Sequence, residues 1–291
     1  MAVACNNNPN RKIIPGYDDL TSGTIHISVD ETFKPIIDSQ IKVFMSLFPK
    51  ATIIPHYKPE AACLKDLLND SIRMVIVTRG LSEEEVNSIK DTLGFKPGFG
   101  RVAYDAVSVI INNKAKDSLF DMGDIKSLMN GTSGYKLTPV LDGKTATSTI
   151  RYMIDSVLKG QPLATNIAGA DSSVGVIDYV ATHEDAIGFI GVSWIGNPDD
   201  KEQLAFLTKV KVASLAVRDE PSKFVKPYQA NIALKRYPMV RGLYYIVKEN
   251  YSGLGRGFTN FLDGEKGQKI FWRAYLVPAR MNFELRQTEI K

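Results

Sequence analysis

Strand patterns and helix patterns alternate along the first third of the chain, and this alternation constrains the fold more than any other feature. Segments with the apolar spacing of strands lie at residues 24–29, 51–55 and 72–78, and helix patterns begin near residues 32, 60 and 83. The segment Ile72 to Thr78 is apolar almost throughout, which is typical of a strand buried in a parallel sheet. Repeated strand–helix units of this kind predict an α/β fold, with a mainly parallel sheet flanked by helices.

Two longer β patterns, at Phe99 to Asn112 and Tyr237 to Val247, indicate how the fold is divided. We expect the chain to leave a first lobe through one long strand near 103–111 and to return through another near 239–247. Two crossing strands form a hinge, and hinged lobes close on ligands held between them. The predicted division is a leader or linker at 1–22, a discontinuous first lobe at 23–105 and 243–291, and a second lobe at 106–242. A single large α/β domain with additions is the alternative.

Composition and motifs exclude several classes of function. A net charge of +4, spread without a basic block, does not indicate a nucleic-acid partner. No apolar run approaches the roughly 20 residues of a membrane span. His26, His56 and His183 are isolated, no metal-binding motif is found, and we expect no metal and no cofactor. No base stands beside a nucleophile, so we expect no catalytic residues and a binding protein rather than an enzyme.

The two cysteines lie in different contexts. Cys63 follows two alanines within a predicted helix, and we expect a buried, inert thiol. Cys5 follows the small residues of Met1–Ala4 and precedes a polar stretch rich in asparagine. This arrangement is similar to the end of a bacterial lipoprotein signal, and Cys5 is therefore the candidate lipidation site. A stray N-terminal cysteine is the alternative.

Two runs of hydroxyl residues lie where amphipathic helices are expected to begin. They are Ser28-Val29-Asp30-Glu31-Thr32 and Thr145-Ala146-Thr147-Ser148-Thr149. The first turn of a helix leaves backbone N–H groups unpaired and carries partial positive charge. Hydroxyls at two such helix starts could hold one oxyanion from opposite sides. Simple N-capping is the alternative for each run, because serine, threonine and aspartate are preferred caps.

Several longer segments, in this order and spacing, resemble one family. From about Gly23 to Ala279 the chain resembles the phosphate-binding proteins of bacterial ABC uptake systems, which belong to the type 2 periplasmic binding protein superfamily. The matching segments are 75–79 with 83–85, 104–112, 176–181 with 186–191, 237–241, 258–262, 267–270 and 276–279.

The resemblance implies an anion held between the lobes by hydroxyls and backbone amides. The family's first loop falls on Ser28 to Phe33, with Thr32 and Phe33 at the helix start. Its contact after the third strand falls on Thr78 and Arg79, although a salt bridge from Arg79 to a helix carboxylate is an equal alternative.

The family's second loop falls on Thr147, Ser148 and Thr149. The arginine of that loop falls on Gly143, so we expect Lys144 to supply the positive charge, and Ser148 replaces a glycine. A phosphate that keeps a proton needs one hydrogen-bond acceptor, and Asp30 or Glu31 could provide it.

The expected function is an extracytoplasmic solute-binding protein in the periplasm or on the outer face of the cell envelope. It would capture inorganic phosphate or a similar oxyanion and, as a monomer, deliver it to an ABC permease in the membrane. One alternative is a phosphate-ester-processing enzyme on the same fold, using Lys144 or Asp105. Another is an anion sensor without a role in transport.

Overall fold

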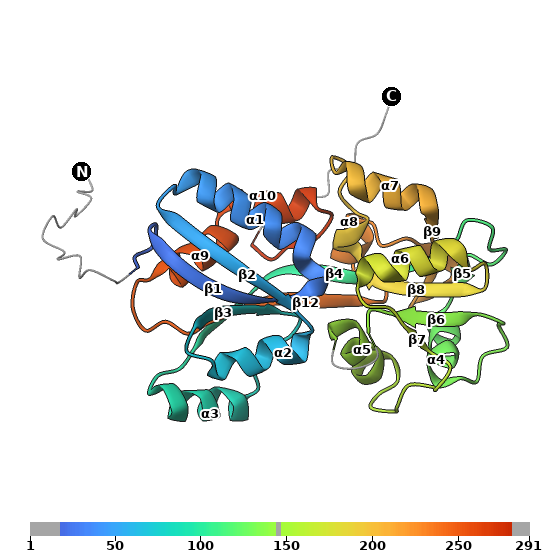
Figure 1. The fold of residues 1–291 in the computed structure, drawn as a ribbon. Helices are drawn as coiled ribbons and strands as arrows, with labels where there is room; N and C mark the ends of the chain where they lie inside the picture. The colour runs from blue at the N-terminus through green and yellow to red at the C-terminus, as the bar shows by residue number, and fades with distance from the viewer. Residues whose placement is uncertain (1–17, 144–146, 281–291) are drawn as a thin grey trace, which may run out of the picture.

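The computed structural model describes residues 18–143 and 147–280. Figure 1 shows two lobes side by side, each with helices packed on a sheet, and strand β4 (Gly98–Asn112) running through both. The two-lobed, mainly parallel α/β architecture expected from the sequence is confirmed. Cys5, Lys144 and residues 1–17 of the leader predicted at 1–22 lie outside the described residues. Within the described ranges, no helix is long and apolar enough to cross a membrane.

The first lobe is built from strand–helix units and is completed by the C-terminal part of the chain. Before β4 it contains β1 (Gly23–Asp30), the 3-10 turn η1 (Glu31–Phe33), α1 (Lys34–Leu47), β2 (Ala51–Lys58), α2 (Glu60–Lys65), η2 (Asp66–Leu68), β3 (Ile72–Val77) and α3 (Glu83–Leu93). After the second lobe it receives β12 (Val240–Val247), α9 (Leu254–Asp263), α10 (Glu265–Arg273) and β13 (Val277–Pro278). The rings of Phe258 and Phe261 lie 5.2 Å and 5.4 Å from the ring of Phe44, so α9 packs on α1.

The second lobe lies between β4 and β12 in sequence. Its first elements are β5 (Leu119–Phe120), α4 (Met122–Asn130), β6 (Thr138–Leu141), α5 (Ser148–Tyr152), the π-helical segment η3 (Met153–Val157), β7 (Ala168–Gly169) and α6 (Ser173–Thr182). They are followed by β8 (Ala186–Gly191), η4 (Val192–Trp194), α7 (Lys201–Lys209), β9 (Val210–Val212), β10 (Ser214–Val217), β11 (Glu220–Val225) and α8 (Gln229–Ala233).

One sheet joins the lobes through β4 and β12. In the described part of the chain its order is β2-β1-β3-β12-β4-β8-β6-β7, with β1, β2 and β3 parallel and β12 antiparallel to β3 and β4. The half of β4 up to Ala106 pairs with β12, whereas its half from Val107 pairs with β8 and β9. These are the two strands that the sequence analysis expected to join the lobes. The proposed division of the sequence at 105/106 and 242/243 remains a prediction.

The structure corrects one local expectation. The strand predicted near 24–29 continues to Asp30, so the first hydroxyl run begins inside β1 rather than at a helix start. In the second lobe, α4 begins at Met122, where Asp121 forms its capping box. The segment 210–217 breaks at Ala213 into β9, which pairs with β4, and β10, which joins a small sheet with β5 and β11.

Candidate functional site

The two hydroxyl runs meet at the junction of the lobes. The chain passes from the carboxyl end of β1 into η1, and β6 ends at Leu141 shortly before α5 begins. The carboxyl ends of strands are where open α/β sheets place their ligands. The hydroxyl oxygens of Thr32, from the first lobe, and Ser148, from the second, are 3.4 Å apart. The convergence that the sequence analysis required is therefore present.

Four buried hydroxyl residues form this site, and we call Thr32, Thr147, Ser148 and Thr149 the hydroxyl cluster. Three of them donate to the carboxylate of Asp142, which follows β6 directly. Thr147 Oγ1 lies 3.1 Å from Oδ1, while Thr149 Oγ1 and Thr32 Oγ1 lie 3.2 Å and 3.3 Å from Oδ2. Thr147 is also the N-cap of α5, accepting from the backbone N–H of Ile150 at 3.2 Å. Thr147 therefore caps α5 and also belongs to the hydroxyl cluster.

Arg241 of β12 supplies a buried positive charge beside the cluster. Its Nη1 donates to Ser148 Oγ at 3.1 Å, and its Nε donates to the buried carboxylate of Asp105 on β4 at 2.8 Å. The guanidinium also lies over the ring of Phe33, 5.2 Å from the ring centre. A Cβ at Gly191 would lie 2.6 Å from the methyl carbon of Thr32 and 3.2 Å from Nη2 of Arg241. A side chain at Gly191 would therefore displace the cluster.

Asp30 lies at the end of β1, and only one of its two carboxylate oxygens is paired. Oδ1 accepts from the backbone N–H of Thr32 at 3.1 Å, whereas Oδ2 is buried without a partner among the described residues. Burial and the nearby Glu60 raise the pKa of Asp30 to about 6, although the charge of Arg241 opposes this. Asp30 is thus an available hydrogen-bond acceptor, and it is mostly ionised at neutral pH.

An ion pair links the lobes at the rim of the cluster. Arg151 of α5 contacts Glu60 of α2, with Nε 2.5 Å from Oε2, and its Nη2 donates to Thr78 Oγ1 at 2.7 Å. Thr78 also donates to Glu60 from both its backbone N–H and its hydroxyl. Burial works to raise the pKa of Glu60, but the bonds from Arg151 and Thr78 outweigh it and hold the pKa below its usual value. Thr78, predicted to contact the ligand, contacts this ion pair.

Two of the predicted ligand-binding residues lie away from the cluster. Ser28 is inside β1 and donates to Asp66, which also pairs with Lys58 at 2.6 Å, so its hydroxyl is not at a helix start. Arg79 makes two contacts of 2.7 Å with Glu85 in the first turn of α3. The alternative of a salt bridge to a helix carboxylate is the one realised for Arg79.

Sequence reasoning did not select Asp142, Arg241 or Glu60 as ligand-binding candidates. Asp142 directly precedes the loop that carries the second hydroxyl run, and Arg241 is a cation inside a long β pattern. A charged residue buried in a strand needs a partner, and this is the signal that could have found Arg241. Glu60 was interpreted only as part of a helix start, where acidic residues are common.

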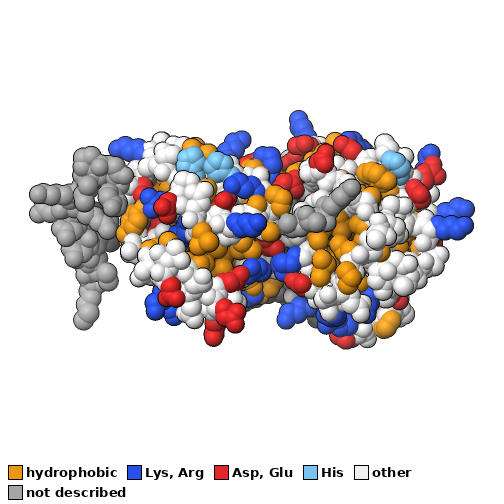
Figure 2. All heavy atoms as spheres, turned by 60° about the horizontal axis from the view of Figure 1, so that its bottom comes forward, with side chains coloured by type: hydrophobic (Ala, Val, Ile, Leu, Met, Phe, Trp, Pro, Cys, Tyr) orange, Lys and Arg blue, Asp and Glu red, His pale blue; other side chains and the backbone are white. Residues whose placement is uncertain are grey.

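A cavity and charged side chains lie at the cleft between the lobes. A cavity of about 300 Å³ lies between the lobes, and Thr147 is the residue of the cluster that lines it. Its other lining residues include Glu60, Arg79, Ile150, Arg151 and Ile154. Figure 2 shows basic and acidic side chains meeting along the seam between the lobes.

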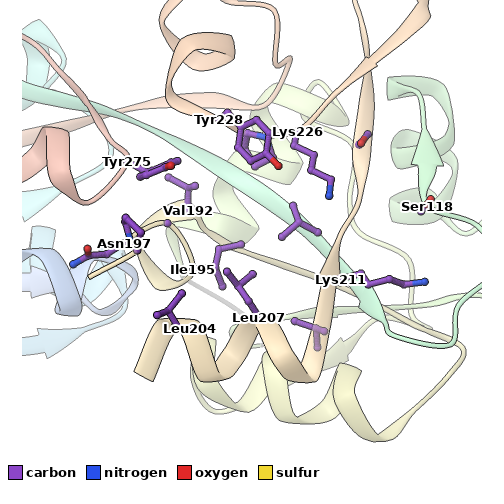
Figure 3. A pocket seen from close by; sticks show the side chains of 16 residues that line it. Ser118, Val192, Ile195, Asn197, Leu204, Leu207, Lys211, Lys226, Tyr228 and Tyr275 are labelled. Carbon is purple, nitrogen blue, oxygen red and sulfur yellow. The ribbon is translucent and has the colours of Figure 1, made fainter. Parts of the chain in front are cut away.

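A second cavity of about 490 Å³ is lined mainly by α7, β9 and nearby loops and contains no residue of the cluster (Figure 3). In residues 18–143 and 147–280, no group of three or more side chains could hold a metal ion.

Comparisons with known proteins agree with this fold. A family model described as a PBP superfamily domain matches residues 18–265. A search of curated proteins gave no match.

Three solved structures share the fold. A Clostridium perfringens protein, assigned as a phosphate ABC transporter substrate-binding protein and crystallised with bound phosphate, has a TM-score of 0.73 at 19% identity and covers 88% of this chain and 100% of its own. An ABC-type phosphate transport receptor from Vibrio cholerae has a TM-score of 0.64 at 16% identity, with coverages of 88% and 100%. A protein from Planctomyces limnophilus DSM 3776, assigned as phosphate-binding, has a TM-score of 0.58 at 18% identity, with coverages of 88% and 93%.

Proposed function

This chain belongs to the PBP superfamily, and we propose that it captures inorganic phosphate or a similar oxyanion between its lobes and delivers it to an ABC permease. The family supports a solute-binding role. The phosphate-related descriptions of the proteins from Clostridium perfringens and Vibrio cholerae support the choice of ligand and of partner.

The observation that carries this proposal is the set of buried donors where the lobes meet. Thr32 comes from the first lobe, Thr147, Ser148 and Thr149 come from the second, and Arg241 donates to Ser148 from a joining strand. Hydroxyl and guanidinium donors are suited to replace the hydration shell of an oxyanion, since hydrogen bonds to a charged group are the stronger kind. The role needs no bond to be made or broken, and the carboxylate of Asp105 is fully buried, with its Oδ2 paired to Arg241.

Asp30 offers a way to select phosphate among oxyanions. Its Oδ2 is a buried acceptor without a partner among the described residues. Phosphate that keeps a proton can donate to this oxygen, whereas sulfate at neutral pH has no proton to donate. The unpaired carboxylate therefore favours phosphate over sulfate, because a buried acceptor left unsatisfied costs about 1–3 kcal/mol.

Isothermal titration of the native protein with phosphate, sulfate and molybdate tests the proposal. We expect phosphate to bind, and Asp30→Asn to weaken phosphate binding while narrowing the difference between phosphate and sulfate. Asp38→Asn is the matched control, because Asp38 is a half-exposed carboxylate on α1 that pairs with Lys34 and Tyr57 rather than with the cluster. If none of the three anions binds, the oxyanion proposal fails. An unchanged phosphate affinity in Asp30→Asn would instead remove only the role of Asp30.

The cellular location is part of the same proposal. Capture for a permease requires a position outside the cytoplasmic membrane, in the periplasm or on the outer face of the envelope. Cys5 is the proposed lipid anchor, since it follows small residues and precedes a polar stretch. Expression with a labelled fatty acid should mark the native chain and leave Cys5→Ser unlabelled. Light scattering on a sizing column tests the expected monomer.

A further inference from the structure

The carboxylate of Asp142 accepts hydrogen bonds from the same hydroxyl groups that an anionic ligand would need as donors. Its two carboxylate oxygens accept hydrogen bonds from Thr32, Thr147 and Thr149, three of the four residues of the hydroxyl cluster. The residue is almost completely buried, and its bond to Thr32 crosses from the second lobe to the first. A hydroxyl has only one proton to donate, so Thr32, Thr147 and Thr149 cannot donate to Asp142 and to a ligand at the same time.

The charges around Asp142 make the competition stronger. Among the described residues, Asp30 at the end of β1 and Glu31 of η1 face it with the same sign, and Arg241 of β12 faces it with the opposite sign. The charge of Arg241 is already shared with Asp105. Among the residues that the structure describes here, one cation therefore balances several carboxylates, and adding an anion to this set in a buried site is unfavourable.

Resting on the proposed function, we propose that Asp142 controls which form of the cleft can bind an oxyanion. The anion binds only when the carboxylate of Asp142 takes up a proton. When Asp142 takes a proton from the solvent, one negative charge disappears and the residue becomes a donor. The hydroxyls of Thr32, Thr147 and Thr149 are then free to turn towards the ligand. The residue thus changes from a competitor of the ligand into a member of its donor set.

The protonation equilibrium of Asp142 lies in the right range for such coupling. Burial and the charge of Asp30, opposed by Arg241, raise the pKa of Asp142 to about 7. An anion bound beside Asp142 raises its pKa further, so binding takes up a proton from the solvent. The coupling to Asp142 should therefore raise the affinity for the anion as the pH falls towards 7 and add little further affinity at lower pH.

The test is a titration with inorganic phosphate from pH 5.5 to 8.5, on the native protein and on Asp142→Asn. Asparagine imitates the neutral form at every pH. At pH 8, we expect Asp142→Asn to bind phosphate about tenfold more tightly than the native protein, because the native carboxyl group is mostly ionised one unit above its pKa. At pH 5.5 the two affinities should agree within about twofold. Asp178→Asn, an exposed carboxylate on α6, is the control and should follow the native curve.

The outcomes separate this inference from the proposed function. If the native protein binds phosphate and its pH dependence matches that of Asp142→Asn, the coupling is wrong and the oxyanion function stands. If neither protein binds phosphate, sulfate or molybdate at any pH, both are wrong. Should Asp142→Asn fail to fold, Asp142→Ser provides a second neutral variant, and the same tenfold difference at pH 8 is expected of it.

Discussion

Arg241 is the residue whose removal should cost the most stability, because it is the buried cation between the hydroxyl cluster and β4. Its side chain is 3% exposed, and that of its partner Asp105 is fully buried. Arg241→Met keeps much of the side-chain volume but leaves Asp105 as an uncompensated buried carboxylate. Breaking a buried ion pair in this way typically costs about 3–5 kcal/mol.

Thermal unfolding followed by calorimetry measures this loss. For a chain of this size, about 3–5 kcal/mol corresponds to a decrease of roughly 5–8 °C in the unfolding midpoint. The loss should be smaller at pH 5 than at pH 8. Burial already raises the pKa of Asp105, and without Arg241 the carboxyl group can escape its unpaired charge by taking a proton as the pH falls. Arg236→Met, an exposed arginine shortly before β12, is the control and should change the midpoint little.

The double variant Arg241→Met with Asp105→Asn tests the reasoning. If the penalty comes from the orphaned carboxylate, removing both charges should restore at least half of the lost stability, since a buried pair replaced as a whole is often close to neutral. A double variant no more stable than Arg241→Met alone would refute this account. The loss would then come from the contact of the side chain with Phe33 or from its bond to Ser148.

Three further predictions follow from the contacts at the cleft. Thr149→Ala should weaken phosphate binding by about 1–3 kcal/mol in calorimetric titration, whereas Ser28→Ala should leave the affinity unchanged, because the Ser28 hydroxyl is bound inside the first lobe. Arg79→Met should change phosphate affinity less than about twofold in the same titration, since its guanidinium is held by a carboxylate of α3. Urea unfolding should show that the free energy of unfolding rises as the pH falls from about 7.5 to 5. Burial raises the pKa values of Asp30 and Asp142 to about 6 and 7, so the folded state binds their protons more tightly than the unfolded chain does. A flat profile over this range would contradict the environments described for the two carboxyl groups.

The order of elements in the first lobe could be predicted because each element carries its own signal. The apolar residues of β3, the capping box at Ser82 and the spacing of α1 are local patterns, and the structure has strands and helices where they indicate. Elements with weak signals escaped prediction. The short strand β6 contains Pro139, and β11 is largely exposed. Neither has the run of apolar residues that marks a buried strand.

The candidate site was only partly accessible to the same reasoning. The hydroxyls of Thr32 and Thr147 were found because residues at helix starts are recognised locally. Arg241 was not selected, because its importance comes from Ser148 and Asp105, about 90 and 140 positions away along the chain. Asp142 has two nearby partners in Thr147 and Thr149, but its bond to Thr32 of the other lobe joins residues 110 positions apart. No pattern within a short window can encode such a pairing.

The sequence by itself determined the α/β class, the two long strands that join the lobes and the presence of two hydroxyl runs, because hydrophobic periodicity and capping act over a few neighbouring residues. Only the tertiary structure decided which polar groups meet. In the structure, β1 extends to Asp30, so Ser28 lies inside the strand and away from Thr32. Arg79 pairs with Glu85, and Asp142 accepts hydrogen bonds from the hydroxyl cluster near Arg241. The physical reason is that hydrogen bonds and charge interactions in a buried site depend on distances between distant segments, and those distances exist only once the sheet has brought the lobes together.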